Sequence, residues 1–221
     1  MCEKLMTINN SQYSLLFILA LFSCGFLTPL IRRVAIRFAI VDRPNQVHKT
    51  HREPIPYLGG LAIIGSVWIV TITGAFAVQI DRQTLESVLG ILLPSTFVGL
   101  IGLWDDIRNL KPLPRFIAQT GGALVTAILI IFTNTVGSPT GNQILDSLIT
   151  IVWIVGITNA INFFDNLDGG ASGTVAISSF GLFLLSATSN QNYLAALAVV
   201  LAGSTTGFLF WNRNPARIYM G

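Results

Sequence analysis

Seven long apolar segments, separated by short polar stretches, dominate the pattern of hydrophobic and polar positions along this chain. Most of them approach the roughly 20 residues that an α-helix needs to cross the hydrocarbon core of a bilayer. They cover residues 13–31, 58–78, 85–104, 116–132, 147–164, 171–187 and 193–211. The pattern predicts an all-α fold, a polytopic membrane helix bundle of about seven transmembrane helices, with residues 1–221 forming a single integral membrane domain.

Two features of the segments bear on packing. The seventh segment is rich in alanine, glycine and serine, and such small residues let helices approach closely. Gly59-Gly60 stands where the second segment begins, so we expect another part of the backbone to approach it closely.

The composition excludes a soluble globular protein. Charged residues make up 10% of the chain against about 25% in soluble domains, and hydrophobic residues make up 52%. The net charge of +3 does not indicate a nucleic-acid partner, because the basic residues are scattered between apolar segments. Cys2 and Cys24 do not predict a disulfide framework or a metal site, since one is terminal and the other lies inside an apolar segment.

The positive charges fall almost wholly on one side when the loops are numbered alternately. The opposite side has only Lys4 and Arg82. By the positive-inside rule, we expect an integral protein of the plasma or inner membrane, with its amino terminus outside and its polar loops in the cytoplasm. The residues on that predicted cytoplasmic side are Arg32, Arg33, Arg37, Arg43, Lys49, Arg52, Arg108, Lys111, Arg115, Arg213 and Arg217.

Acidic residues gather on the same predicted side. Asp105 and Asp106 follow the third apolar segment, where carboxylates are costly and are usually retained for a function. Both can turn toward one cation at a helix end, and Mg²⁺ typically takes one or two carboxylates together with phosphate oxygens and water. The alternative is a solvated helix end with Arg108 and Lys111 as partners.

A second polar run ends the fifth apolar segment. Asn159, Asn162 and Asp165 recur every third residue and share one face if the helix continues, whereas Gly169-Gly170 would end the helix and leave Asp168 in the turn. Amides and carboxylates together suit a nucleotide or a sugar phosphate, because amides donate and accept while carboxylates hold metal. The alternative is a polar cluster that serves helix packing alone.

The first predicted cytoplasmic loop, residues 42–57, is basic and proline-rich, so a regular helix is not expected there. Arg43, Lys49 and Arg52 suit phosphate oxygens, and His48 or His51 could donate to one. An ordinary basic loop attracted to anionic lipid head groups would have the same composition.

Together these motifs, in this order, resemble the polyprenyl-phosphate N-acetylhexosamine-1-phosphate transferases of glycosyltransferase family 4. The matching pieces are Asp42-Arg43-Pro44-Asn45 with His48-Lys49 and Pro54 to Gly60; Gly102 to Asp106 through Gln119; Asn159 to Asn162 with Asp165 and Asp168-Gly169; and Asn214-Pro215-Ala216. The first-loop pattern is more similar to the branch that transfers GlcNAc-1-phosphate than to the muramoyl-pentapeptide branch. Asn166 and Gly170 depart mildly from the family pattern, which usually has Gly and Leu there.

The resemblance implies a transfer of sugar-1-phosphate, GlcNAc-1-phosphate or a related one, from a UDP-sugar to undecaprenyl or another polyprenyl phosphate. UMP is released, and the product initiates a cell-envelope glycan. The implied cofactor is Mg²⁺, with Mn²⁺ as an alternative, and nothing in the sequence decides whether the chain forms a homodimer.

Site roles carry over from the family by position. Asp105, Asp106 and Asp165 are the implied catalytic and metal-binding residues. The implied substrate-binding residues are Asn159, Asn162, Asp168, His48, Lys49 and Arg52. Whether Asp105 attacks covalently, acts as a base or holds metal stays open.

In the family the last motif continues after Gly221 with a metal-binding Asp, further spans and a histidine-bearing loop. We therefore expect this chain to correspond to the amino-terminal part of a longer family fold and, alone, to be inactive or weak. The alternatives from other classes are a transporter or flippase of phosphorylated lipids, which would favour carboxylates near mid-bilayer, and a non-catalytic membrane remnant.

Overall fold

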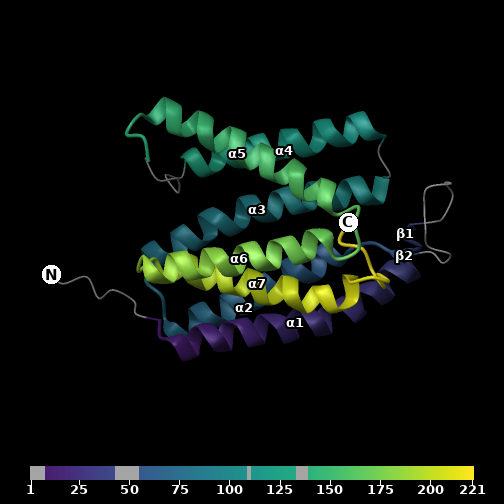
Figure 1. Cartoon of the computed structure of the whole chain (residues 1–221), viewed down its shortest axis with the longest axis horizontal. Helices are drawn as coiled ribbons and strands as arrows, with labels where there is room; N and C mark the ends of the chain where they lie inside the picture. The colour runs from purple at the N-terminus through teal and green to yellow at the C-terminus, as the bar shows by residue number, and fades with distance from the viewer. Residues whose placement is uncertain (1–7, 43–54, 109–110, 133–138) are drawn as a thin grey trace.

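The computed structural model describes residues 8–42, 55–108, 111–132 and 139–221. Seven helices in these ranges are long and apolar enough to cross a membrane, and they run back and forth along a common direction (Figure 1). The predicted all-α, multi-pass membrane fold is confirmed. The helices are α1 (Asn10–Arg37), α2 (Gly59–Val78), α3 (Arg82–Arg108), α4 (Pro112–Phe132), α5 (Gln143–Phe164), α6 (Gly170–Thr188) and α7 (Asn192–Asn212).

Several helices extend past their apolar segments. α1 continues to Arg37 and α3 to Arg108, because arginine is a good helix former whose aliphatic stem can follow apolar surface while its charge reaches water. One short exception to the all-α prediction is an antiparallel pair of two-residue strands, β1 (Val41–Asp42) and β2 (Ile55–Pro56), in which Val41 pairs with Pro56 and Asp42 with Ile55.

The helix α7 lies at the centre of one half of the bundle, packed against α1, α2 and α6 (Figure 1). Its small residues permit this position, as the sequence predicted. A side chain on Gly207 would meet the backbone of Leu21 in α1, with its Cβ 3.0 Å from the Leu21 carbonyl carbon. Ser204 shares a 3.0 Å hydrogen bond with Ser66 of α2 at full burial.

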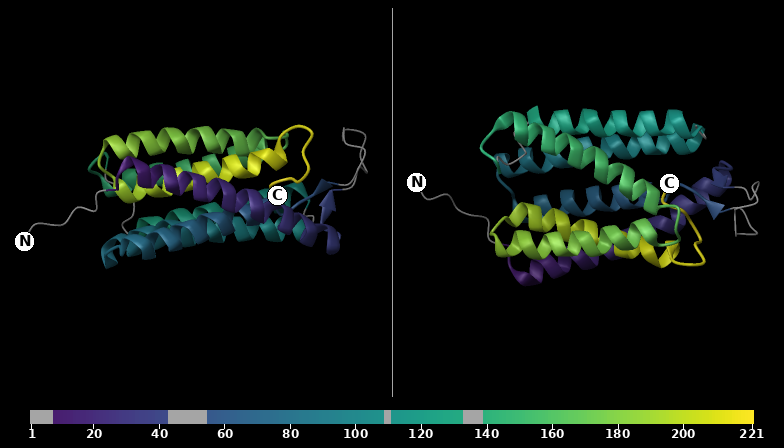
Figure 2. Two further views of the ribbon diagram at one scale, coloured as in Figure 1. Left: turned by 90° about the horizontal axis from the view of Figure 1, so that it is seen from below. Right: turned by 45° about the horizontal axis from the view of Figure 1, so that its top comes forward.

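The helices α3, α4 and α5 form the other half, with α4 packed against both neighbours (Figure 2). Trp68 of α2 links the two halves by donating from Nε1 to the hydroxyl of Thr96 in α3 at 2.8 Å.

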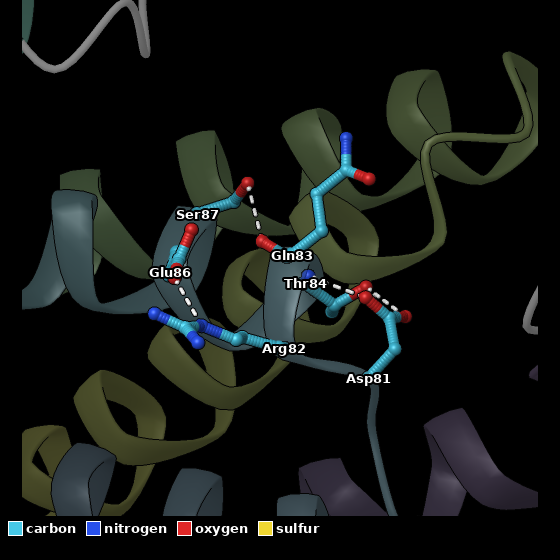
Figure 3. Close-up of polar contacts among 6 residues, drawn as sticks. All are labelled: Asp81, Arg82, Gln83, Thr84, Glu86 and Ser87. Atoms are coloured by element: carbon cyan, nitrogen blue, oxygen red, sulfur yellow. Dashed lines mark hydrogen bonds and ion pairs between the residues drawn. The ribbon is translucent and has the colours of Figure 1, made fainter.

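The amino terminus of α3 is capped by the residue before it, in the close-up of Figure 3. Both carboxylate oxygens of Asp81 accept from Thr84, one from its backbone N–H at 2.9 Å and one from its hydroxyl at 2.8 Å. These bonds hold the pKa of Asp81 below its usual value. Arg82 and Glu86 form an exposed ion pair one turn apart, of the kind that contributes little stability.

The last residues of the chain fold back across the helix ends at the opposite end of the bundle. The N–H of Gly59 donates to the Tyr219 carbonyl at 3.0 Å, and that of Gly60 donates to the Met220 carbonyl at 2.6 Å. A Cβ on Gly59 would lie 2.6 Å from the Tyr219 oxygen, so a larger residue does not fit. The expected close approach at Gly59-Gly60 is confirmed, and its partner is the segment 213–221.

Candidate functional site

Two carboxylates from helices far apart in sequence meet at the end of the chain. Asp106 lies in the last turn of α3, and Asp165 is the residue that caps the end of α5. The N–H of Gly221 donates to Asp165 Oδ2 at 3.3 Å. A Cβ on Gly221 would stand only 2.6 Å from Asp106 Oδ2, so the Asp106 carboxylate lies against the same residue. The fold therefore brings two of the three predicted metal-binding residues together.

The structure describes the other predicted residues at this end only in part. The backbone of Asp105 belongs to α3, but its side chain is outside the described part of the chain. His48, Lys49 and Arg52 also lie outside the described residues. Their roles remain predictions from sequence.

Burial makes the carboxyl of Asp165 a weaker acid than usual. Desolvation raises the pKa of its carboxyl to about 6, and the hydrogen bond from the Gly221 N–H offsets only part of that effect. Positive charge near the carboxylate would favour its ionised form, so a bound cation would bring its pKa back down.

The turn after Asp165 differs from the sequence prediction. α5 ends at Phe164, and the glycines begin the next helix rather than ending this one: Gly169 has a left-handed φ of 73° and caps the start of α6 at Gly170. Asp168 lies in the turn, as expected, where its Oδ2 accepts from the N–H of Ala216 at 3.0 Å.

The amides of α5 face a neighbouring helix. Asn162 donates to Gln119 Oε1 of α4 at 2.8 Å. Asn159 donates to the Val155 carbonyl at 2.8 Å and to the Thr120 hydroxyl at 3.4 Å. Asp165 follows as the C-cap with right-handed helical dihedral angles and donates its N–H to the Ile161 carbonyl at 3.1 Å, so the backbone keeps the helical spacing of Asn159, Asn162 and Asp165. The two amides themselves bond within the α4–α5 pair. Asn162 is nevertheless exposed and remains accessible from outside the bundle.

Asn212 is a further residue of this end of the bundle, and the sequence predictions assign it no role. It ends α7, is 1% exposed, and bonds both to the turn that carries Asp168 and to the segment that ends at Gly221. The available signal was a polar amide at the end of an otherwise apolar segment, which carries a high cost unless the amide is fully bonded.

The donor set suits a magnesium ion. No group of three or more His, Cys, Asp or Glu side chains gathers among the residues described. Asp106 and Asp165 nonetheless supply the one or two carboxylates that Mg²⁺ takes when phosphate oxygens and water fill its other positions. Arginines at the ends of α1 and α3 add positive charge at the same end of the bundle, including Arg37 and Arg108.

These features define a polytopic membrane protein in which two carboxylates meet at one end of the helices. Comparison with known families is more specific: residues 88–221 match the profile of glycosyl transferase family 4. The chain belongs to this family, and the resemblance inferred from its motifs is confirmed.

Curated relatives agree with this assignment. The chain is 33% identical over 214 residues to the probable undecaprenyl-phosphate N-acetylglucosaminyl 1-phosphate transferase of Bacillus subtilis, an alignment covering 93% of this chain and 57% of the relative. It is 35% identical over 217 residues to the decaprenyl-phosphate N-acetylglucosaminephosphotransferase of Mycolicibacterium smegmatis, covering 89% and 52%.

A relative from another branch is also similar. The phospho-N-acetylmuramoyl-pentapeptide-transferase of Limosilactobacillus fermentum is 33% identical over 185 residues, with 75% of this chain and 54% of the relative covered. The chain thus spans little more than half the length of these three relatives.

Proposed function

We propose that the protein to which this chain belongs transfers a sugar-1-phosphate from a UDP-sugar to a polyprenyl phosphate and releases UMP. GlcNAc-1-phosphate carried to undecaprenyl phosphate is the favoured pair, because two of the similar relatives are named for N-acetylglucosamine transfer to a polyprenyl phosphate. The product would initiate a cell-envelope glycan. The observation that carries the proposal is the meeting of Asp106 and Asp165 at Gly221 in a member of this family.

The chemistry fits such a site. An oxygen of the lipid phosphate attacks the phosphorus that bears the sugar, the bond from that phosphorus to the bridging oxygen breaks, and UMP leaves with the electron pair. Mg²⁺ held by Asp106 and Asp165 would neutralise phosphate charge. The lipid phosphate is largely ionised at neutral pH, so the carboxylates need to orient groups more than to remove a proton.

The position of the acids also bears on the choice of function class. Asp106 lies in the last turn of its helix and Asp165 just past the end of its own. A lipid transporter that relays protons would favour carboxylates deeper in the membrane. We further propose that this end faces the cytoplasm, where the excess of positive charge predicts it to lie.

The test supplies membranes containing the protein with undecaprenyl phosphate and UDP-GlcNAc labelled in the sugar. We expect UMP and lipid-linked label in equal amounts, both dependent on Mg²⁺ or Mn²⁺ and both lost in Asp106→Asn. The signal is measured against that of Asp106→Asn membranes. Labelled lipid formed without UMP, or equal rates above background for the wild-type protein and Asp106→Asn, would contradict the proposal.

A further inference from the structure

The buried side chain of Asn212 joins two segments that are far apart in sequence. Its Oδ1 accepts from the N–H of Gly169 at 3.2 Å and from the hydroxyl of Ser172 at 2.7 Å. Its Nδ2 donates to the carbonyl of Ile218 at 3.1 Å. Both Ser172 and Ile218 are fully buried, so water cannot replace these bonds.

The two segments joined by Asn212 are those that carry the acidic site. Gly169 belongs to the turn that holds Asp165 and Asp168, and Ile218 belongs to the segment that ends at Gly221. The bond from the Gly221 N–H to Asp165 is the contact between them at the site. One amide therefore bonds to both sides of that contact without touching it, beside the bond from the Ala216 N–H to Asp168 and those from Gly59 and Gly60 to the segment 213–221.

Only an amide meets the requirements of this position. Its oxygen must accept from two donors while its nitrogen donates to a carbonyl, a combination that a carboxylate or a hydrocarbon lacks. An ionised aspartate would face the Ile218 carbonyl with no proton to donate, and leucine would leave three polar groups unpaired, two of them on fully buried residues. Buried groups left without partners are costly, which makes the position intolerant of substitution.

We propose that Asn212 is a positioning residue that sets Asp165 against Gly221, and thereby the geometry of the acidic site. The expected effect on metal binding rests on the proposed function, because the carboxylate that Asn212 positions is one of the two proposed to hold the metal. Replacing a residue that orients metal-binding side chains typically lowers metal affinity 10–100-fold.

The test compares Asn212→Ala and the milder Ser172→Ala with Ser204→Ala, all in the full 221-residue chain in lipid nanodiscs. Ser204 is a matched control, because it lies on the same helix, is fully buried and makes a hydrogen bond between helices away from the site. Thermal unfolding of each variant measures general loss of stability.

Hydrogen exchange is the first readout. We expect Asn212→Ala to speed exchange at least tenfold in both segments, 165–170 and 213–221, and Ser172→Ala to speed it about fivefold in 165–170, as the loss of one hydrogen bond predicts. Ser204→Ala leaves both segments unchanged. Equal exchange in all three variants, or unchanged exchange in Asn212→Ala and Ser172→Ala, overturns the proposal.

Binding of Mn²⁺, followed by electron paramagnetic resonance, is the second readout. We expect about a tenfold loss of affinity in Asn212→Ala and a change within about twofold in Ser204→Ala, even where their unfolding temperatures fall equally. Equal losses in both overturn the positioning role. A wild-type chain that binds no Mn²⁺ contradicts the assignment of Asp106 and Asp165 as a metal site, while hydrogen exchange still decides whether Asn212 positions the two segments.

Discussion

Asp165 ends α5 with its carboxylate partly withdrawn from water and one oxygen facing the Gly221 N–H. The raised pKa of this group, about 6, means that the folded chain binds a proton at Asp165 more tightly than the unfolded chain does. Above pH 6 the folded state therefore carries a free-energy cost for the ionised carboxylate. That cost fades as the pH falls toward the ordinary pKa of the unfolded chain.

Replacing Asp165 with Asn is expected to stabilise the chain at pH 7.5 in the absence of divalent cations. The expected gain in free energy of unfolding is about 1–2 kcal/mol, below the full linkage value because the carboxylate is not completely buried. Thermal unfolding at pH 7.5 and pH 4 measures it, and the difference between the two proteins should vanish at pH 4. A variant that is less stable than the wild type at pH 7.5 would show that the carboxylate is a net stabilising group.

At the scale of the element, the small residues of α7 let this helix pack closely against its neighbours. The sequence predicted close helix contact for it, and the structure supplies the neighbour: the backbone of α1 passes directly over Gly207. A glycine at such a crossing lets two backbones pack without an intervening side chain, which favours association in a lipid environment where burial of apolar surface gives no driving force.

Gly207→Ala is expected to destabilise the chain by about 1–3 kcal/mol, because the added methyl group would overlap the backbone of Leu21. Gly181→Ala on α6 is the matched control, since nothing lies within 4 Å of a Cβ at that position. Thermal unfolding in nanodiscs compares the two. Similar destabilisation by both substitutions would mean that the α1–α7 crossing is not the cause.

The cap of α3 gives a second prediction at this scale. Asp81→Ala removes both bonds to Thr84, so the amides of the first turn of α3 should exchange several-fold faster, with α7 unaffected. Because the pKa of Asp81 is lowered in the folded chain, its contribution is present above its ordinary pKa and is lost in acid as the pH falls through the lowered value. Gln83→Ala is the control, and equal exchange in the two variants would argue against the cap.

At the scale of the whole molecule, hydropathy predicts the seven helices. It does not predict which side chains lie close together at the helix ends. Seven spans followed from length and apolarity because a membrane helix satisfies its own backbone. The convergence of Asp106 and Asp165 depends on which helices are neighbours, and span lengths carry no such information. Loop charge predicted that both acids lie on one face of the membrane, and the family resemblance then suggested that they converge.

The limits of pattern reasoning are clearest at the α5–α6 junction. The sequence predicts that Gly169-Gly170 ends the helix of Asn159 and Asn162, yet α5 ends at Phe164 and Gly169 caps the following helix. Asn212 was missed because its partners lie in two segments outside its own helix. A side chain of this kind leaves no periodic signal in sequence.

The central claim is that Asp106 and Asp165 form a site for a metal ion and a nucleotide sugar. The most direct test measures binding of labelled UDP-GlcNAc to the chain in nanodiscs, with and without Mg²⁺, for wild type, Asp106→Asn and the Ser204→Ala control. We expect binding that requires the cation, is displaced by UMP, weakens about tenfold or more in Asp106→Asn and is unchanged in Ser204→Ala. Binding that is independent of Mg²⁺, or equally strong in Asp106→Asn, would contradict it.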